Sequence, residues 1–424
     1  MVGGFSDLFP NCRWDNPMNE RCVPLPYCCQ EVYGMRILYL SNACAEEEFY
    51  EIFTEKIKPS QAAQKYHTLQ IQGLRETGQE LTALCIPAIS RVTYKGVFFR
   101  YRGRNKDFLF MPMVNIPLLR NIWMFLYVFF FTLFRTIGKR GDGVICDVLN
   151  TTVSMAALSA CFLTRTPSVG IVTDVPTKRA FEVRNPVKKL AARVCWFQLG
   201  KFDRYIFLTH AMNDLINRKN RPYMVSEGHV DSHAAAVTDS IDQKYEKKVC
   251  IYAGSLREIY GIPYLVEAFL KADVPNAELH IYGAGEYEQT LWELSEKYPS
   301  VRFFGLMPNE HIVREERKAT LLINPRPTDE EYTKYSFPSK NMEYMVSGTP
   351  VLTTKLPGMP EEYEEFVYLI PQENADALAQ ELRKLLCKSA EELFAFGQRA
   401  KTFVLENKNN VKQAERICRF LSNS

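Results

Sequence analysis

The stretch Tyr335-Ser-Phe-Pro-Ser-Lys-Asn-Met-Glu-Tyr-Met-Val-Ser-Gly-Thr-Pro-Val351 decides how the C-terminal half of this chain folds. It contains a helical pattern followed by an apolar strand. We expect the helix over 337–347, with Ser336 as its N-cap and Pro338 tolerated in its first turn. Gly348 ends the helix, because glycine readily adopts the left-handed conformation that stops helices. The segment therefore predicts a helix wedged between two strands of a parallel sheet.

A helix that begins at the carboxyl edge of such a sheet binds anions, because its first N–H groups are free and its dipole is positive there. Lys340 in the first turn adds a full positive charge. Glu343, one turn further in, can accept two hydrogen bonds from the vicinal hydroxyls of a ribose. The arrangement is that of a nucleoside diphosphate site. The residues of this segment that we assign to it are Tyr335, Ser336, Phe337, Pro338, Ser339, Lys340 and Glu343.

Short apolar segments alternate with amphipathic helical patterns along the chain. One such pattern has apolar residues at Ile262, Leu265, Val266 and Phe269. Alternation of this kind predicts an α/β protein with parallel sheets and helices on both faces. The strands that we expect lie at 36–41, 80–86, 107–114, 143–147, 168–173, 204–208 and 223–226, and then at 249–254, 278–282, 301–305, 320–324, 350–354 and 366–370.

The polar stretch His229–Lys248 breaks this alternation, as interdomain linkers do. We therefore expect two α/β domains of similar size, 35–232 and 249–404, joined by a linker at 233–248. A last amphipathic helix within 405–424 can pack back onto the first domain.

The first 34 residues contain four prolines and no continuous apolar run. We therefore expect a disordered leader and no secretory signal; the alternative is a translation start chosen too far upstream.

The composition is that of a globular protein, with 46% hydrophobic and 24% charged residues among 424. A net charge of +3 without a dense basic tract gives no sign of nucleic-acid binding. Of the 12 cysteines, Cys85, Cys146 and Cys250 lie in apolar strands as small hydrophobes, and we expect reduced thiols in a cytoplasmic protein. No set of Cys, His, Asp or Glu has the spacing of metal ligands.

One segment, 122–134, is unusually apolar and is flanked by Arg120 and Arg135. Thirteen residues make a helix of about 20 Å, too short to cross the roughly 30 Å hydrocarbon core of a bilayer. We favour a helix buried in the protein. The alternative is a helix at the membrane interface, supported by the basic, apolar stretch 188–197. It predicts peripheral contact with the inner face of the membrane through 116–140 and 188–197.

The segment around Lys340 resembles the signature helix of family-4 retaining glycosyltransferases of the GT-B fold, whose motif is Glu-x7-Glu followed by a Gly-x-Pro-Val turn. Glu343 corresponds to the second glutamate, and the turn is Gly348–Val351. Tyr335 stands where the family has its first glutamate, which contacts the donor sugar, so we interpret the chain as a Phe-Pro-Ser-Lys variant. The resemblance, which covers about 35–421, implies two Rossmann-like domains that face an interdomain cleft.

Three further segments resemble the same family. Tyr252–Gly261 resembles the first strand and loop of the donor domain, where the family usually supplies an Arg and a Lys to the diphosphate; Arg257 is our hypothesis for a substitute. Leu279–Glu286 resembles the strand that ends in Gly-x-Gly beside the nucleotide, and Glu227–Asp231 resembles the domain junction. The additional donor-binding candidates are Gly254, Ser255, Arg257, Gly283 and Gly285.

On the acceptor side, the family often has a histidine after the fourth strand, close to the transferred sugar. This chain has Asp147 there, and Asp174 ends the next strand. Because open α/β sheets bind ligands at the carboxyl ends of their strands, Asp147, Asp174 and Lys340 are our catalytic candidates. A turn or helix cap is the alternative for either aspartate. His67 lies in a helical pattern and is more typical of a packed or solvated histidine.

The resemblance implies a bacterial-type glycosyltransferase that moves a sugar from a nucleotide-diphosphate sugar to a hydroxyl with retention, without metal or other cofactor. Surface polysaccharide or glycolipid synthesis is the expected setting, with a glycan or lipid-linked acceptor. Two alternatives stay open. One is a GT-B sugar-nucleotide epimerase, which needs no acceptor, and the other is a non-catalytic scaffold at the membrane.

Overall fold

The computed structural model describes residues 34–54, 59, 61–104, 106–138, 142–175, 185–236 and 238–422. The predicted leader lies outside these residues, except for Gly34.

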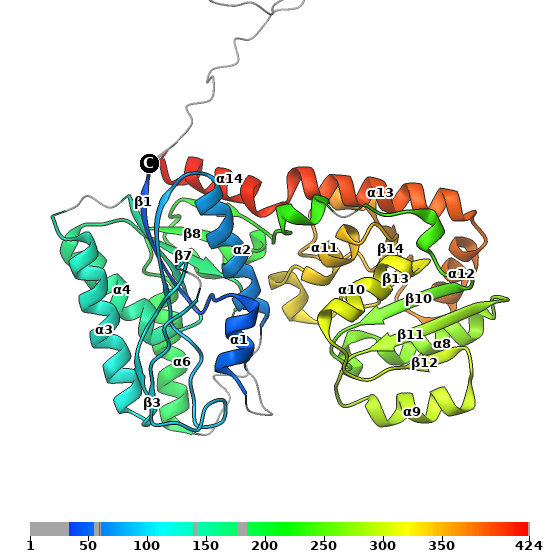
Figure 1. Ribbon diagram of the computed structural model, residues 1–424, viewed down its shortest axis with the longest axis horizontal. Helices are drawn as coiled ribbons and strands as arrows, with labels where there is room; N and C mark the ends of the chain where they lie inside the picture. The colour runs from blue at the N-terminus through cyan, green and yellow to red at the C-terminus, as the bar shows by residue number, and fades with distance from the viewer. Residues whose placement is uncertain are drawn as a thin grey trace, which may run out of the picture. The chain divides into compact units, whose positions relative to one another are not determined.

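The first sheet contains seven parallel strands in the order β4-β2-β1-β6-β7-β8-β9. Its central strands are almost wholly buried because helices cover both faces, as parallel sheets require. These strands are β1 (Arg36–Ser41), β2 (Glu80–Cys85), β4 (Leu109–Phe110), β6 (Gly143–Asp147), β7 (Ser168–Val172), β8 (Arg204–Phe207) and β9 (Tyr223–Val225). The helices are α1 (Glu46–Ile52), α2 (Ala62–Glu76), α3 (Leu119–Thr136), α4 (Thr151–Thr164), α6 (Pro186–Leu199) and α7 (His210–Ile216) (Figure 1).

The single strand expected at 107–114 is wrong. The chain forms β4 and then β5 (Met113–Val114), which pairs antiparallel with β3 (Phe98–Phe99) in a separate ribbon. Pro112 stands between the two pieces and has no N–H to donate to a ladder. The proline therefore ends the pairing to the main sheet.

The second sheet contains six parallel strands in the order β12-β11-β10-β13-β14-β15. Apolar clusters lie on its two faces, and the residues of the predicted amphipathic pattern at 262–269 are buried in one of them, as expected. The strands are β10 (Lys248–Ala253), β11 (Ala277–Tyr282), β12 (Val301–Phe303), β13 (Leu321–Asn324), β14 (Val351–Thr353) and β15 (Tyr368–Leu369).

Helices and short 3-10 turns surround this second sheet (Figure 1). The helices around it are α8 (Ile262–Ala272), α9 (Glu288–Lys297), α10 (Asn309–Lys318), α11 (Ser339–Val346), α12 (Ala375–Leu386) and α13 (Ala390–Asn407). The helix α14 (Asn410–Ser422) follows α13 and leaves the second domain. The 3-10 turns are η1 (Ser232–Ala236), η2 (Ile241–Gln243), η3 (Glu258–Tyr260), η4 (Glu331–Tyr335) and η5 (Glu361–Phe366).

The last helix, α14, packs on α2 beside the first sheet (Figure 1). The two helices meet so closely that a Cβ on Gly73 would lie 2.2 Å from the Asn410 carbonyl oxygen. Arg204, at the start of β8, donates to the Leu421 carbonyl at 2.7 Å. The C-terminal end of the chain thus belongs to the packing of the first domain.

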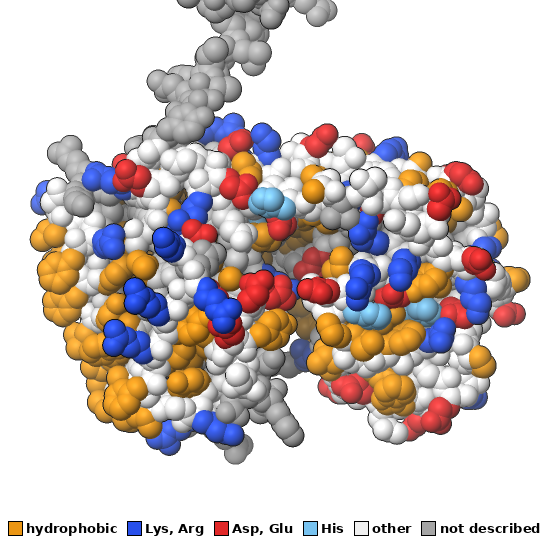
Figure 2. Space-filling model, in the orientation of Figure 1, with side chains coloured by type: hydrophobic (Ala, Val, Ile, Leu, Met, Phe, Trp, Pro, Cys, Tyr) orange, Lys and Arg blue, Asp and Glu red, His pale blue; other side chains and the backbone are white. Residues whose placement is uncertain are grey.

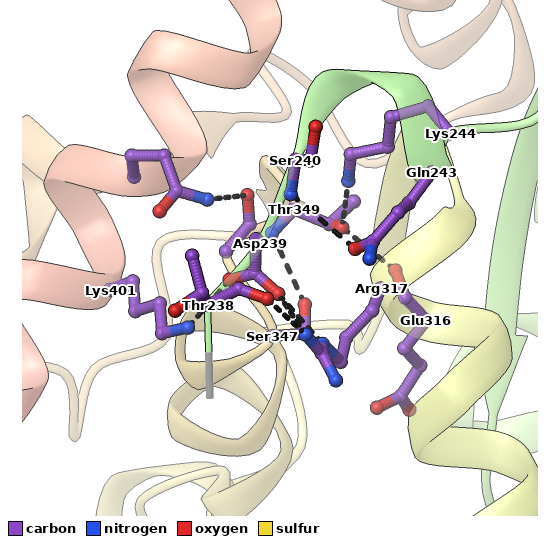
Figure 3. A network of polar contacts seen from close by, with 12 residues as sticks. Thr238, Asp239, Ser240, Gln243, Lys244, Glu316, Arg317, Ser347, Thr349 and Lys401 are labelled. Atoms are coloured by element: carbon purple, nitrogen blue, oxygen red, sulfur yellow. Dashed lines mark hydrogen bonds and ion pairs between the residues drawn. The ribbon is translucent and has the colours of Figure 1, made fainter. Parts of the chain in front are cut away.

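The residues expected as a linker carry a buried ion cluster (Figure 3). The Asp239 carboxylate is 4% exposed and binds Arg317 of α10 at 2.7 Å and Lys401 of α13 at 2.5 Å. Burial raises the pKa of Asp239, but the hydrogen bonds from Lys401 and Arg317 outweigh it and hold that pKa below its ordinary value. Lys244 donates to the Thr349 hydroxyl at 2.6 Å. The segment therefore holds α10, α13 and the turn after α11 together.

Candidate functional site

The signature helix α11 starts at Ser339, two residues later than the sequence predicts. Phe337 is 6% exposed, and its ring centroid lies 5.1 Å from that of Tyr363. Phe337 therefore packs in the core and lies outside the helix. Pro338 occupies the N-cap position, and Ser336, which follows η4, does not cap the helix. The predicted N-cap is therefore wrong. No side chain caps α11, and the N–H groups of Ser339 and Lys340 have no hydrogen-bond partner among the described residues, whereas the Asn341 N–H donates to the Pro338 carbonyl at 3.0 Å.

Lys340 reaches from α11 to the carboxyl end of β10. Its ammonium donates a hydrogen bond to the Ala253 carbonyl and lies 5.8 Å from the Tyr252 ring centroid. A Cβ on Gly254 would lie 2.0 Å from the Lys340 nitrogen, so a larger residue there would displace the end of the Lys340 side chain. Burial lowers the pKa of Lys340, while the nearby carboxylates of Glu343 and Glu316 oppose that change. The structure thus brings Lys340 and Gly254 together.

Two glycine-containing loops run against each other beside Lys340. Gly254 donates to the Tyr282 carbonyl at 2.9 Å, and Gly283 donates to the Gly305 carbonyl at 2.8 Å. A Cβ on Gly283, whose φ is +138°, would lie 1.7 Å from the Gly254 oxygen, and one on Gly285 would lie 2.6 Å from the Leu256 backbone. These glycines let the β10 and β11 loops pack together and leave exposed backbone at the sheet edge.

Two arginines flank the Tyr260 ring at the same edge. The exposed Arg257 lies 5.5 Å from the ring centroid, and Arg326, just after β13, lies 4.7 Å from it. Arg326 also lies 5.8 Å from the Tyr332 ring. The Arg326 Nε and the Tyr332 hydroxyl are buried and have no hydrogen-bond partner among the described residues. Arg257, Arg326 and Lys340 therefore form a cationic group with unused donors.

Sequence reasoning missed Arg326. The available signal was its place in Asn324-Pro-Arg326, directly after a predicted strand and at the edge where the other candidates end. A basic residue at the carboxyl end of a parallel strand is a ligand-binding candidate for the same reason as Asp147 and Asp174.

Two acidic residues lie next to the cations. Glu343 on α11 is exposed, as a ribose-binding residue needs. Glu316 on α10 is 5% exposed, and no hydrogen bond or ion pair to its carboxyl group is described. Burial, with the Glu343 charge, raises the pKa of Glu316 to about 8, although Lys340 acts in the other direction. Glu316 is therefore largely protonated at neutral pH, which no sequence pattern indicated.

Of the remaining donor candidates, Ser255 is exposed in the β10 loop and Ser339 is exposed at the start of α11. Tyr335 is half-buried in η4, and the half-buried Ser336 has a hydroxyl without a partner among the described residues. Phe337 belongs to the core. The side chains that can touch a ligand are thus fewer than the continuous motif suggests.

On the acceptor side, Asp147 is buried at the end of β6. One carboxylate oxygen accepts a hydrogen bond from the Leu149 N–H at 3.0 Å, and the other lies 3.5 Å from His67 Nε2. His67 is fully buried, and its Nδ1 lies 2.8 Å from the Tyr39 hydroxyl. This chain of buried groups favours the turn-cap alternative for Asp147.

Asp174, after β7, is exposed, and its carboxylate accepts a hydrogen bond from the Val175 N–H at 2.8 Å. Partial desolvation raises the pKa of Asp174. Of the two aspartates, Asp174 is the one whose carboxylate a hydroxyl substrate can reach.

The first domain contacts the segment that precedes α11. The Thr209 hydroxyl, after β8, donates to the Lys334 carbonyl of η4 at 2.9 Å. At the domain junction, Glu227 accepts a hydrogen bond from the Tyr363 hydroxyl at 3.0 Å and pairs with Lys408 at 2.5 Å. The carboxyl edge of the first sheet and the donor-site segment are therefore in direct contact.

No group of three or more His, Cys, Asp or Glu side chains within the described residues is arranged to hold a metal ion.

Two comparisons with known sequences relate part of this chain to glycosyltransferases. Residues 238–403 match the family model described as glycosyl transferases group 1. WcaL of Escherichia coli, assigned provisionally to colanic acid biosynthesis as a glycosyltransferase, is 29% identical over 158 residues. That match covers 36% of this chain and 39% of WcaL, so the chain spans about two fifths of the length of this relative.

Comparison with solved structures extends over nearly the whole chain. HepE from Anabaena, solved in complex with UDP, has a TM-score of 0.62 at 15% identity and covers 92% of this chain and 100% of its own. Sucrose-phosphate synthase from Thermosynechococcus elongatus has a TM-score of 0.63 at 14% identity, with 91% and 99% covered. These similarities, at low identity, show the fold. The predicted GT-B class with two Rossmann-like parallel-sheet domains is confirmed.

Proposed function

We propose that this protein transfers a sugar from a nucleotide-diphosphate sugar to a hydroxyl group of a glycan or lipid-linked acceptor, in surface polysaccharide or glycolipid synthesis. The observation that carries the proposal is the cationic group of Arg257, Arg326 and Lys340 at the uncapped start of α11. The group 1 glycosyltransferase match and the structural similarity to HepE, solved with UDP, support it.

The residues suit the departure of a nucleoside diphosphate. As the bond from the anomeric carbon to the phosphate oxygen breaks, the electron pair stays on the diphosphate and its negative charge grows. Lys340, Arg326 and the free N–H groups of α11 are fixed donors for that charge, and such donors typically contribute a few kcal/mol each. Glu343 is assigned to the ribose hydroxyls. The acceptor oxygen bonds to the anomeric carbon, and its proton passes to the carboxylate of Asp174, the acceptor-side residue.

For the acceptor side we propose Asp174 and leave Asp147 in a supporting role. The Asp174 carboxylate is exposed, whereas that of Asp147 is engaged by Leu149 and His67. Retention of configuration, a reaction without metal or other cofactor, and a location in the cytoplasm are proposed on the resemblance to family-4 enzymes.

The experiment is a screen of UDP-, GDP-, ADP- and dTDP-sugars, with calorimetry for binding and release of free nucleoside diphosphate as the readout. A transferase binds at least one donor and turns it over faster when an acceptor hydroxyl is supplied. Release of nucleotide at full rate with donor alone, together with an epimerised sugar, would identify an epimerase. If no nucleotide sugar binds, the chain is a scaffold and the proposal fails.

The assignment is tested by Lys340→Ala in the same assay, with Lys297→Ala as the control, because Lys297 is an exposed lysine of α9 remote from the β10 loop. Turnover should fall in the first variant and stay unchanged in the second. Equal turnover in both would contradict the assignment of Lys340.

A further inference from the structure

Three helices of the first domain carry no acidic residue. The helices α3, α4 and α6 have 18, 14 and 14 residues and contain no Asp or Glu, although the chain has 49 such residues in 424. α3 packs on α4, and α4 packs on α6. The charged residues with described side chains on these helices are all basic: Arg120, Arg135, Lys189 and Arg193. This layer therefore has only positive charge to offer a partner.

The α3 helix is apolar on opposite faces. Met124 and Val128 lie on the buried face, at a spacing of one turn. On the other face, Leu126, Phe130 and Phe134 are 45%, 47% and 71% exposed. A helix that is apolar all round is normally buried. Burial, which the sequence favoured, is therefore wrong for this outer face.

A groove between α4 and α6 continues the apolar surface. Phe162 is 83% exposed, Leu163 61% and Phe197 60%, and the groove encloses about 2120 Å³, counting the part open to solvent. Arg165, Lys201 and Asp203 line it as well, all exposed. The Lys201 ammonium lies 4.1 Å from the Phe197 ring centroid, and the Asp203 carboxylate accepts hydrogen bonds from the N–H and hydroxyl of Ser168. The groove lies at the amino ends of β7 and β8, the edge opposite to that of Asp147 and Asp174. It is therefore separate from the proposed acceptor site.

We propose that this face of α3, α4 and α6 binds an anionic lipid bilayer. The exposed residues of α3 enter the interface, and Arg165 and Lys201 meet lipid phosphates at the groove. Figure 2 shows apolar side chains gathered over the α3 side of the first domain, with Lys and Arg among them. Among the described residues, no helix has both the length and the apolarity needed to cross a bilayer. Contact in the plane of the membrane is what an 18-residue helix with an exposed apolar face and basic residues near both ends provides.

Charge decides between a bilayer and a protein partner. Apolar area of this extent on a protein surface marks an interaction site, and a second copy of this face would bring its predominantly basic side chains together. An anionic bilayer offers both an apolar interior and phosphates. Lys and Arg side chains near such a surface are attracted to its negative charge, and the exposed aromatic side chains add the apolar contact.

The test is co-sedimentation of the full chain with vesicles of phosphatidylcholine alone or with one quarter phosphatidylglycerol, without donor. The wild-type chain should bind the anionic vesicles at least tenfold more tightly, and 0.5 M salt should weaken that binding. Two double variants, Phe130→Ser/Phe134→Ser and Arg165→Glu/Lys201→Glu, should each bind the anionic vesicles at least tenfold more weakly than the wild type. Leu306→Ser, a substitution of a 77% exposed residue in the second domain, is the matched control and should bind like the wild type.

Equal sedimentation of all four proteins would overturn the proposal, as would equal binding to both vesicle types. Light scattering without vesicles tests whether a second copy of the chain binds this face instead. A wild-type dimer that becomes monomeric in the Phe130→Ser/Phe134→Ser variant would make the face a contact between copies and overturn the bilayer proposal. Because no nucleotide sugar is present, failure here leaves the proposed transferase activity to its own test.

Discussion

Replacement of Glu343 with alanine should separate nucleotide binding from folding. Glu343 is exposed, and no hydrogen bond or ion pair to its carboxylate is described. Its removal should change the free energy of unfolding of the free protein by less than about 0.5 kcal/mol. Hydrogen bonds to a charged group contribute about 1.5–3 kcal/mol, so loss of the ribose contact should weaken UDP binding by roughly 10- to 150-fold.

The assay is calorimetry with UDP and with 2′,3′-dideoxy-UDP, on the wild type, Glu343→Ala and the control Glu296→Ala. Glu296 is an exposed glutamate of α9. The dideoxy nucleotide should bind the wild type weakly and should bind the wild type and Glu343→Ala equally well. If Glu343→Ala loses the same factor for both nucleotides, the carboxylate does not hold the ribose hydroxyls. Unchanged UDP affinity would refute the whole assignment of α11.

Three further predictions address the groups around this carboxylate. In steady-state assays, Arg326→Gln should slow the release of nucleoside diphosphate about a hundredfold. Arg257→Gln should slow it much less, because Arg257 is exposed, whereas the Arg326 Nε is buried. Equal effects of the two substitutions would contradict the larger role assigned to Arg326. Glu316 has its pKa raised to about 8 in the folded chain, against 4.5 unfolded, so its stabilising effect is complete below pH 4.5 and is lost as the pH rises towards 8. In the wild type, the free energy of unfolding in urea should fall by up to about 1.4 kcal/mol per pH unit in that window, and Glu316→Gln should remove this fall. An unchanged pH slope in the variant would contradict the raised pKa of Glu316. Gly283→Ala should lower the free energy of unfolding by about 1–3 kcal/mol and weaken UDP binding, because its Cβ would meet the Gly254 backbone. The control is Gly305→Ala, which also has a positive φ, of +68°, but open space around the added Cβ. Equal losses of UDP affinity in both variants would exclude the loop contact as the cause.

The fold was largely predictable because its signals are local. Apolar periodicity located Ile262 and Leu265 on the buried face of α8, and alternation of strands with helices predicted two parallel sheets. The prediction failed at 107–114, where apolar composition hid the effect of Pro112 on pairing. Local periodicity thus identifies helices and strands. Where one strand ends and the next begins within an apolar run depends on which neighbouring strand each part pairs with.

The candidate site was predictable only in part, because several of its properties arise from tertiary contacts. Lys340 and Glu343 followed from the helix pattern, but the start of that helix did not, since Phe337 gains more from packing against Tyr363 than from helix formation. Arg326 and Glu316 come from other elements. The place of Arg326 directly after a predicted strand is a usable signal, whereas nothing in the sequence around Glu316 indicates that it lies near Lys340.

The ion cluster behind α11 explains how Lys340 can be fixed without a ligand. The Gly348 carbonyl at the end of α11 accepts a hydrogen bond from Gln398, and the next residue, Thr349, is held by Lys244 (Figure 3). Asp239 ties α10 and α13 together around this turn. With its C-terminal turn fixed, α11 cannot rotate freely, so the Lys340 ammonium stays at the β10 carbonyl edge. Electrostatic stabilisation of a leaving diphosphate needs donors that do not reorganise during the reaction, and this cluster, which holds Thr349 of the Gly348–Val351 turn, provides that rigidity.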